Sequence, residues 1–205
     1  FHKLLYDKLQ KKVILARDTF GVKPLYYSLT TKSLTFASEI KAILQNRNYK
    51  PEFDYDAFGS YLTYRYNPSP QTLFKNIYKL KPGEFLEYKF NGEYKLNYFE
   101  QSVPKLNQNI SEQDAVEEYS RLLSLAVKRQ LTSDVPVGLF LSGGIDSAVL
   151  GYFMNENNYK GYNSYSVGFS GKGNYNELDD AKITSDYLKV YNTSVSINQN
   201  DYLNF

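Results

Sequence analysis

An apolar run, Val135–Leu141, passes without interruption into the hexapeptide Ser142-Gly143-Gly144-Ile145-Asp146-Ser147. A run of this kind is typical of a strand buried on both faces of a parallel sheet. The apolar spacing that follows predicts a helix from about Ile145 to Asn157. The chain is thereby constrained to a strand–loop–helix unit, and its loop lies at the carboxyl end of a parallel strand, where α/β sheets bind their ligands.

The segments around this unit continue the alternation of helix and strand. A capping-box pattern that begins at Ser111 starts a predicted helix. Farther along, the pattern predicts strand Tyr162–Phe169, helix Glu177–Lys189, strand Asn192–Ile197 and the start of a helix over Asn198–Phe205. Strands that alternate with helices at this spacing form a parallel sheet wrapped by helices. The apolar positions expected to face inward from the first of these helices are Val116, Tyr119, Leu122, Leu123, Ala126 and Val127.

The first half of the chain has short apolar segments separated by turn residues, which is typical of antiparallel strands. Asn91-Gly92 is a favoured two-residue hairpin sequence. Short helices are expected after Ser38 and after Asp54, and Asp54 can cap the second of them. The predicted strands are Leu4–Asp7, Val13–Ala16, Leu25–Ser28, Leu34–Ala37, Glu84–Tyr88 and Glu93–Tyr98. The helical residues expected to point inward are Ile40, Ile43 and Leu44 in the first helix and Phe58, Tyr61 and Leu62 in the second.

The polar segment Gln101–Asn109 contains Pro104 and is the predicted linker between the two patterns. The expected fold class is therefore α/β and α+β: a β-rich domain over residues 1–104, then a parallel-sheet domain over residues 105–205. Because the chain begins at Phe1 rather than Met and stops within a predicted helix, we expect both domains to be partial.

The composition of the chain excludes several kinds of partner and of functional site. Residues 1–105 hold 17 Lys and Arg against 10 Asp and Glu, and residues 106–205 hold 7 against 12, yet the basic residues are scattered. We therefore expect no nucleic-acid partner. The chain has no Cys and a single His, His2, which excludes thiolate and His-rich metal sites and disfavours a Ser–His–Asp triad. No apolar run approaches the roughly 20 residues that span a bilayer, so we expect no membrane association.

The hexapeptide has the residue types that a phosphate-binding loop needs. Gly143 and Gly144 let an anion approach the backbone, and the following helix start supplies N–H donors and a favourable dipole. Ser142 and Ser147 add hydroxyl donors. Asp146 would repel a phosphate, but it suits Mg²⁺ bound to one. No Gly-Lys-Ser/Thr follows and the three-glycine dinucleotide spacing is absent, so the loop is expected to hold the β,γ-pyrophosphate of ATP while a nucleophile attacks the α-phosphorus.

Ser142–Ser147 matches the SGGxDS motif of the N-type ATP pyrophosphatases, and Asp134–Ser147 as a whole resembles the glutamine-hydrolysing asparagine synthetases. The resemblance extends to Ala16–Tyr27, with Ala-Arg-Asp-Thr-Phe-Gly-Val-Lys-Pro-Leu-Tyr-Tyr, to Phe36–Ala42, and to Thr72–Leu86, with Leu80-Lys-Pro-Gly83. It covers nearly the whole chain in order. It implies the closing part of an N-terminal-nucleophile glutaminase domain followed by the start of an ATP-pyrophosphatase domain of the adenine nucleotide α hydrolase-like type.

The resemblance also implies roles for individual residues. Ser142, Gly143, Gly144, Asp146 and Ser147 would hold pyrophosphate and its Mg²⁺. Leu141 and Val167 would line the adenine site, and Asp18 would bind the α-amino group of glutamine. The implied substrates are glutamine, ATP and aspartate. Glutamine would be hydrolysed, and its ammonia would convert aspartate to asparagine through β-aspartyl-AMP in the cytoplasm; a homodimer stays open.

The sequence departs from the family at several points. The family's glutaminase nucleophile is an N-terminal Cys, and this chain has no Cys, so no catalytic residue is expected within it. Asn176-Glu177 stands where the family often has Asp-Glu, and Thr193-Ser194 falls near a frequent His. The acceptor is therefore open: a related amidotransferase or cyclase could adenylate a sugar acid, a peptide or a β-amino acid. A non-catalytic ATP-binding scaffold is the alternative from another class, and the intact loop argues against it.

Overall fold

The computed structural model describes residues 2–30, 33–47, 49–100, 105–106, 109–170, 176–198 and 201. The chain divides into two compact units, Phe1–Lys105 and Leu106–Phe205. It is a mixed α/β structure with antiparallel sheets in the first unit and a parallel sheet in the second. Most of the predicted linker Gln101–Asn109, and all of Asn198–Phe205 except Asn198 and Asp201, lie outside the described residues.

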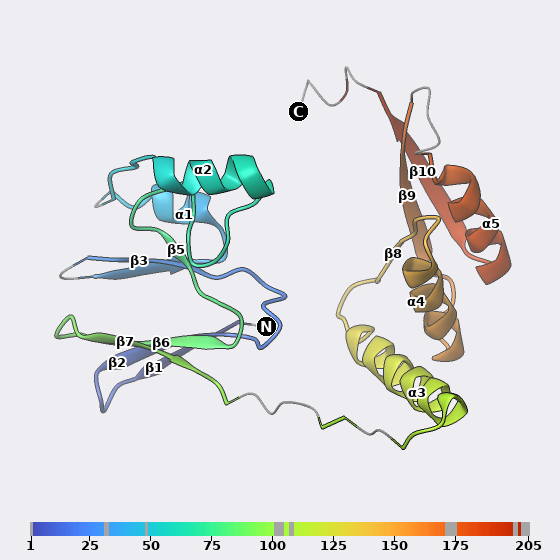
Figure 1. Ribbon diagram of the computed structural model, residues 1–205, viewed down its shortest axis with the longest axis horizontal. Helices are drawn as coiled ribbons and strands as arrows, with labels where there is room; N and C mark the ends of the chain where they lie inside the picture. Colours follow the sequence, from blue (N-terminus) through green and yellow to red (C-terminus); the bar gives the residue numbers. More distant parts are fainter. Residues whose placement is uncertain are drawn as a thin grey trace. The chain divides into compact units, whose positions relative to one another are not determined.

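The first unit contains two antiparallel sheets that lie one above the other in Figure 1. One sheet has the strand order β1-β2-β6-β7, and the other has the order β4-β3-β5. The strands are β1 (His2–Asp7), β2 (Lys12–Arg17), β3 (Tyr26–Leu29), β4 (Leu34–Ala37), β5 (Tyr78–Lys79), β6 (Glu84–Lys89) and β7 (Tyr94–Tyr98). The predicted hairpin is confirmed: Gly92 between β6 and β7 has a φ of 93°, which glycine adopts readily.

The core of this unit lies between the two sheets. The side chains that meet there are each at most 4% exposed, and they are Leu15, Leu25, Tyr27, Leu80 and Leu86. Three of them lie in β2, β3 and β6, and the other two lie just before β3 and just after β5. The core therefore holds the loop that follows β2, after Arg17, against the turn that precedes β6, before Glu84. That pairing of loop and turn positions Asp18, the candidate residue of this unit, which follows β2 directly.

Helices α1 (Ile40–Leu44) and α2 (Tyr55–Tyr64) lie on the far side of the β4-β3-β5 sheet from the other sheet (Figure 1). The Asp54 cap is confirmed, because its Oδ1 accepts hydrogen bonds from the amides of Asp56 and Ala57. The prediction that Phe58, Tyr61 and Leu62 point inward is wrong: they are 36%, 42% and 65% exposed.

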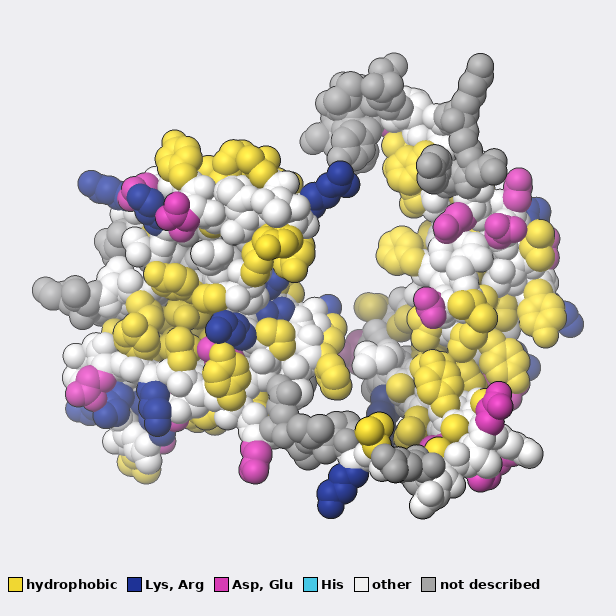
Figure 2. All heavy atoms as spheres, viewed as in Figure 1, with side chains coloured by type: hydrophobic (Ala, Val, Ile, Leu, Met, Phe, Trp, Pro, Cys, Tyr) yellow, Lys and Arg dark blue, Asp and Glu magenta, His cyan; other side chains and the backbone are white. Residues whose placement is uncertain are grey.

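The physical reason is that α2 packs through its smallest side chain. Ala57 is fully buried, whereas the ring of Phe58 contacts the rings of Phe53 and Tyr61 at the surface. A space-filling view shows hydrophobic side chains exposed over α2 (Figure 2). Helical spacing predicted the apolar stripe correctly but not the face through which the helix packs.

The second unit is built on a parallel sheet with the strand order β10-β9-β8. Its core cluster joins the sheet to all three helices and consists of Val127, Leu139, Leu141, Met154, Tyr162 and Ala181. The elements are α3 (Glu112–Gln130), β8 (Leu139–Phe140), α4 (Ile145–Glu156), β9 (Asn163–Phe169), α5 (Leu178–Leu188) and β10 (Tyr191–Ile197). The predicted alternation of strand and helix is confirmed.

Two expectations for this unit are wrong. Val135–Leu141 is a strand only at Leu139–Phe140, and it is not buried on both faces: Val135 and Phe140 are 68% and 82% exposed. The reason is that the described helices cover one face of the sheet. Leu139 points to that face, whereas Phe140, Tyr165 and Val167 point to the other.

Helix α3 is likewise covered over part of its length. Val127 is buried and Leu123 packs against the core, but Val116, Tyr119 and Leu122 are more than half exposed. Ala126 is also exposed. The core contacts of α3 come from its second half, where the side-chain Nδ2 of Asn157 also donates to the Ser124 carbonyl. In the described part of the chain, no helix is both long and apolar enough to cross a bilayer.

Candidate functional site

The loop between β8 and α4 is the first candidate site. The amide of Leu141 donates to the carbonyl of Tyr165 at 2.8 Å, which ties the start of the loop to β9. Gly144 is the N-cap of α4 and has no side chain with which to cap it. The first N–H groups of this helix of 12 residues are therefore directed at the space beside the loop, as in anion sites at helix starts.

The two loop hydroxyls lie side by side. Ser142 Oγ and Ser147 Oγ are 3.0 Å apart, and each takes part in the loop's own backbone contacts. The amide of Gly144 donates to Ser142 Oγ, and the amide of Ser142 donates to Ser147 Oγ, both at 3.2 Å. The structure thus brings together the serines and glycines that the sequence singled out, in one exposed turn.

Glu177 and Asp180 also belong to this site, although the sequence did not predict that they contact the loop. Glu177 Oε2 accepts a hydrogen bond of 3.3 Å from the amide of Gly143, across 34 residues of sequence. A Cβ at Gly143 would come within 2.8 Å of Asp180 Cβ. The start of α5 therefore packs directly on the loop. No local sequence pattern indicates a contact between residues so far apart. The contact forms because the chain returns through β9 and α5 to the loop.

Asp146 lies in the first turn of α4 with its side chain exposed. Within the described ranges, no group of three or more His, Cys, Asp and Glu could by itself hold a metal ion. Asp146 still fits Mg²⁺, because this ion usually takes one or two carboxylates and completes its shell with water and substrate phosphates.

Leu141 and Val167 do not share a face of the sheet. The Leu141 side chain is 2% exposed and belongs to the core under the helices, whereas Val167 is 50% exposed on the other face. If both contribute to an adenine site, Leu141 contributes through its backbone at the strand end, and Val167 through its side chain.

Asp18, in the other unit, follows β2 directly and is 9% exposed. Its Oδ1 accepts hydrogen bonds from the amides of Phe20 at 3.2 Å and Val22 at 3.1 Å. Burial by itself raises the pKa of this carboxyl group, whereas hydrogen bonds from backbone amides, led by that of Val22, act in the opposite direction and hold the pKa below its usual value. Asp18 is therefore an anion at neutral pH, as a partner for an ammonium group must be.

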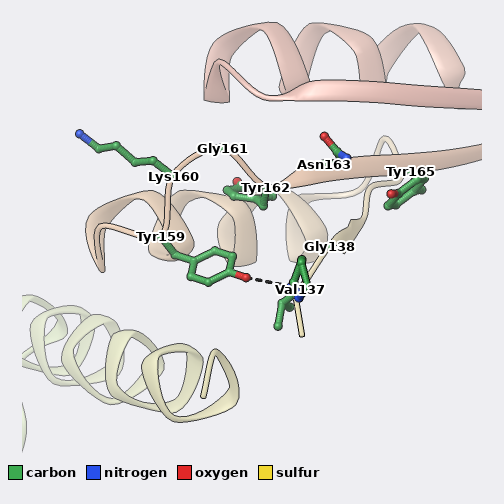
Figure 3. Close-up of a pocket in the computed structure, with 9 residues that line it drawn as sticks. Val137, Gly138, Tyr159, Lys160, Gly161, Tyr162, Asn163 and Tyr165 are labelled. Carbon is green, nitrogen blue, oxygen red and sulfur yellow. Dashed lines mark hydrogen bonds between the residues drawn. The ribbon is translucent and has the colours of Figure 1, made fainter. Parts of the chain in front are cut away.

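A cavity of about 380 Å³ lies at the amino ends of β8 and β9, the opposite end of these strands from the loop (Figure 3). Its two central tyrosines have structural contacts: Tyr159 Oη accepts from the Val137 amide at 2.8 Å, and Tyr162 Oη donates to the Gly151 carbonyl at 3.1 Å. Parallel sheets bind ligands at the carboxyl ends of their strands, so this cavity is not the candidate site.

Comparisons with known proteins match the two halves separately. Residues 1–99 match the family model of the glutamine amidotransferase domain, and residues 118–205 match that of asparagine synthase.

Several relatives align with more than nine-tenths of the chain. A putative glutamine-hydrolysing asparagine synthetase 2 of Methanocaldococcus jannaschii is 33% identical over 97% of this chain and 39% of its own length. Asparagine synthetase 1 of Bacillus subtilis is 33% identical over 100% of this chain and 32% of its own length. Amidase chry2 of Gibberella zeae is 30% identical over 93% of the chain and 30% of its own length. The chain thus spans about a third of the length of these relatives.

Proposed function

Because this chain belongs to the family in which a glutamine amidotransferase domain precedes an asparagine synthase domain, we propose that it serves the ATP-dependent amidation of aspartate to asparagine, with glutamine as the nitrogen donor. The observation that carries the proposal is the Ser142–Ser147 loop at the carboxyl end of β8, with its serines 3.0 Å apart at the uncapped start of α4. Two family matches in the expected order support the same conclusion.

The loop's part is to hold the pyrophosphate of ATP. The amides at the start of α4 and the hydroxyls of Ser142 and Ser147 donate to phosphate oxygens, and they stabilise the negative charge that grows on pyrophosphate as it leaves. Asp146 is the residue that would hold Mg²⁺, which supplies charge neutralisation at the phosphates when bound.

Adenylation explains why a carboxylate ligase needs such a loop. A carboxylate is a poor electrophile, so its oxygen attacks the α-phosphorus, the α–β phosphoanhydride bond breaks and pyrophosphate leaves. Ammonia then attacks the carbonyl of β-aspartyl-AMP, the acyl–phosphate bond breaks, and AMP leaves with asparagine as the product. The backbone of Leu141 and the side chain of Val167 are the proposed contacts to adenine.

Asp18 is the proposed glutamine contact. Its carboxylate stays ionised at neutral pH, and its position is fixed by the amides of Phe20 and Val22. An ionised, pre-positioned carboxylate forms a charge-assisted hydrogen bond with the α-ammonium of an amino acid. That contact selects glutamine over amides that lack the ammonium group.

The second candidate is a related amidotransferase that adenylates a different carboxylate. The similarity to Amidase chry2 favours it, because that relative aligns with 93% of the chain and its name does not mention asparagine. Both candidates use the loop and Asp18 in the same way, and they differ in the acceptor alone.

Replacement of Asp146 tests the loop's role. In the product of the complete reading frame, Asp146→Asn should lower pyrophosphate release from ATP by about a hundredfold or more, because Mg²⁺ loses its protein ligand. Glutamine hydrolysis should be unchanged. The matched control is Asp186→Asn, an exposed acid of α5 paired with Lys182 at 3.0 Å, which should leave both activities intact. Unchanged pyrophosphate release in Asp146→Asn would remove Asp146 from the site.

A further inference from the structure

Two buried serines of β9 face the layer between the sheet and its helices. Ser164 and Ser166 are 0% and 3% exposed. Residues two apart in a strand point to the same face, so both hydroxyls enter the same covered layer. A buried hydroxyl is costly unless it forms a hydrogen bond, so the partner of each hydroxyl shows which part of the backbone it holds.

The Ser166 hydroxyl binds the end of β8, directly before the candidate loop. Its Oγ is 2.7 Å from the carbonyl oxygen of Leu141 and 3.2 Å from Oδ1 of Asn192. A hydroxyl has one proton to donate, and the shorter contact is the better hydrogen bond, so the proton belongs to the Leu141 carbonyl. Because β8 ends at Phe140, this bond extends the attachment of the chain to β9 by one residue, as far as the loop.

The Ser164 hydroxyl is directed at β10 instead. Its Oγ lies 3.1 Å from Asn192 Oδ1 and 3.3 Å from the carbonyl oxygen of Tyr191. The two serines therefore share a strand, a face and near-complete burial, but within the described part of the chain it is Ser166 whose hydroxyl bonds the residue before the loop.

The Leu141 carbonyl and the Ser142 amide belong to one planar peptide unit, and this unit is held at both ends. Ser166 holds the carbonyl, and the Ser142 amide donates to Ser147 Oγ at 3.2 Å. Because the unit is planar, a fixed carbonyl also fixes the direction of the amide. The Ser147 hydroxyl accepts that amide with a lone pair, so its proton can turn from the Gly144 carbonyl, 3.1 Å away, to a phosphate oxygen.

We propose that Ser166 is a positioning residue for the nucleotide: its buried hydroxyl fixes the peptide between Leu141 and Ser142, so that the hydroxyls of Ser142 and Ser147 are in place for the β,γ-pyrophosphate of ATP. This inference rests on the proposed role of the Ser142–Ser147 loop. Without the Ser166 hydroxyl the peptide is free to rotate, and the ligand then has to order the loop when it binds, which lowers its affinity.

The test uses inorganic pyrophosphate, with Mg²⁺ present, as the probe for the loop in the product of the complete reading frame. Titration calorimetry should show that Ser166→Ala raises the Kd for pyrophosphate and the Kd for ATP about tenfold each, as for loss of one buried hydrogen bond. Glutamine hydrolysis, which the other unit is proposed to serve, should be unchanged.

Ser164→Ala is the matched control, because it removes an equally buried hydroxyl from the same face of β9. Urea unfolding should show similar losses of stability in the two alanine variants, whereas Ser164→Ala should leave both Kd values unchanged. An equal rise in Kd in both variants, or no rise in Ser166→Ala, would make Ser166 a structural residue and overturn the positioning role.

Ser147→Ala separates the inference from the function on which it rests. It removes a hydroxyl that is proposed to bind phosphate, and it should raise the Kd for pyrophosphate by about tenfold or more. If it does not, the proposed role of the loop is wrong and the inference falls with it. If Ser147→Ala weakens pyrophosphate binding and Ser166→Ala does not, the role of the loop stands and the inference alone is overturned.

Ser166→Cys provides an independent variant should Ser166→Ala not fold. A thiol occupies the place of the hydroxyl but is a weak donor, so the Leu141 carbonyl loses most of its hydrogen bond without a cavity being left. The Kd for pyrophosphate should rise about as much as in the alanine variant. A folded cysteine variant with an unchanged Kd would contradict the proposal.

Discussion

Gly143 lies where the loop meets the start of α5. A Cβ at this position would be 2.8 Å from Asp180 Cβ and 3.3 Å from Glu177 Cβ, both within the same unit. We predict that Gly143→Ala pushes the loop and α5 apart and weakens ATP binding roughly tenfold, the equivalent of a modest overpacking cost. Titration calorimetry with ATP and Mg²⁺ measures the effect.

Gly59 is the matched control for this substitution. It lies inside α2, and a Cβ there would meet nothing within 4 Å. Gly59→Ala should leave ATP affinity unchanged and stabilise the first unit by about 0.5–1 kcal/mol through helix propensity. Equal ATP affinity in both alanine variants would show that contact between Gly143 and α5 does not shape the nucleotide site.

The sequence predicted the contacts of some site residues but not those of others. Ser142, Ser147 and Asp146 lie in one short motif, so their proximity follows from the local chain. Glu177 reaches Gly143 from 34 residues away, and Ser166 reaches Leu141 from 25 residues away. Such contacts depend on how strands and turns come together, and a single sequence carries no local pattern for them.

At the scale of elements, the helix starts are where local sequence decides most. Ser111 is the N-cap of α3, and its Oγ accepts from the Asp114 amide at 3.1 Å. We predict that Ser111→Ala lowers the free energy of unfolding of the second unit by about 1 kcal/mol, because an N–H of the first turn loses its acceptor. Urea unfolding followed by circular dichroism measures the difference.

Ser120→Ala, a substitution in the middle of α3, is the control for the cap. Alanine has the higher helix propensity, so this variant should be neutral or slightly more stable. A loss of stability in Ser120→Ala as large as that in Ser111→Ala would mean that the capping contact is not the cause.

The periodicity of the sequence predicted the types of the elements better than their burial. The expected helix Ile145–Asn157 is α4, Ile145–Glu156, and the expected strand Tyr162–Phe169 is β9, Asn163–Phe169. By contrast, Phe140 and Tyr119 are exposed, although their apolar character favoured the interior. Spacing indicates that a face is apolar, and packing partners elsewhere in the chain determine whether that face is covered.

For the molecule as a whole, the change of hydrophobic period near residue 105 indicated two parts of different class, and the structure divides between Lys105 and Leu106. The first unit carries Asp18, and the second carries the Ser142–Ser147 loop. Each half-reaction of the proposed chemistry therefore has its candidate residues in a different unit.

The measurement that tests the central claim most directly is pyrophosphate release from ATP by the product of the complete reading frame, with glutamine present and with aspartate compared against a sugar acid, a peptide and a β-amino acid. We predict release that depends on aspartate, with one asparagine formed for each pyrophosphate. Release that depends only on another acid would contradict aspartate as the acceptor. The absence of release with every acid would contradict adenylation at the loop.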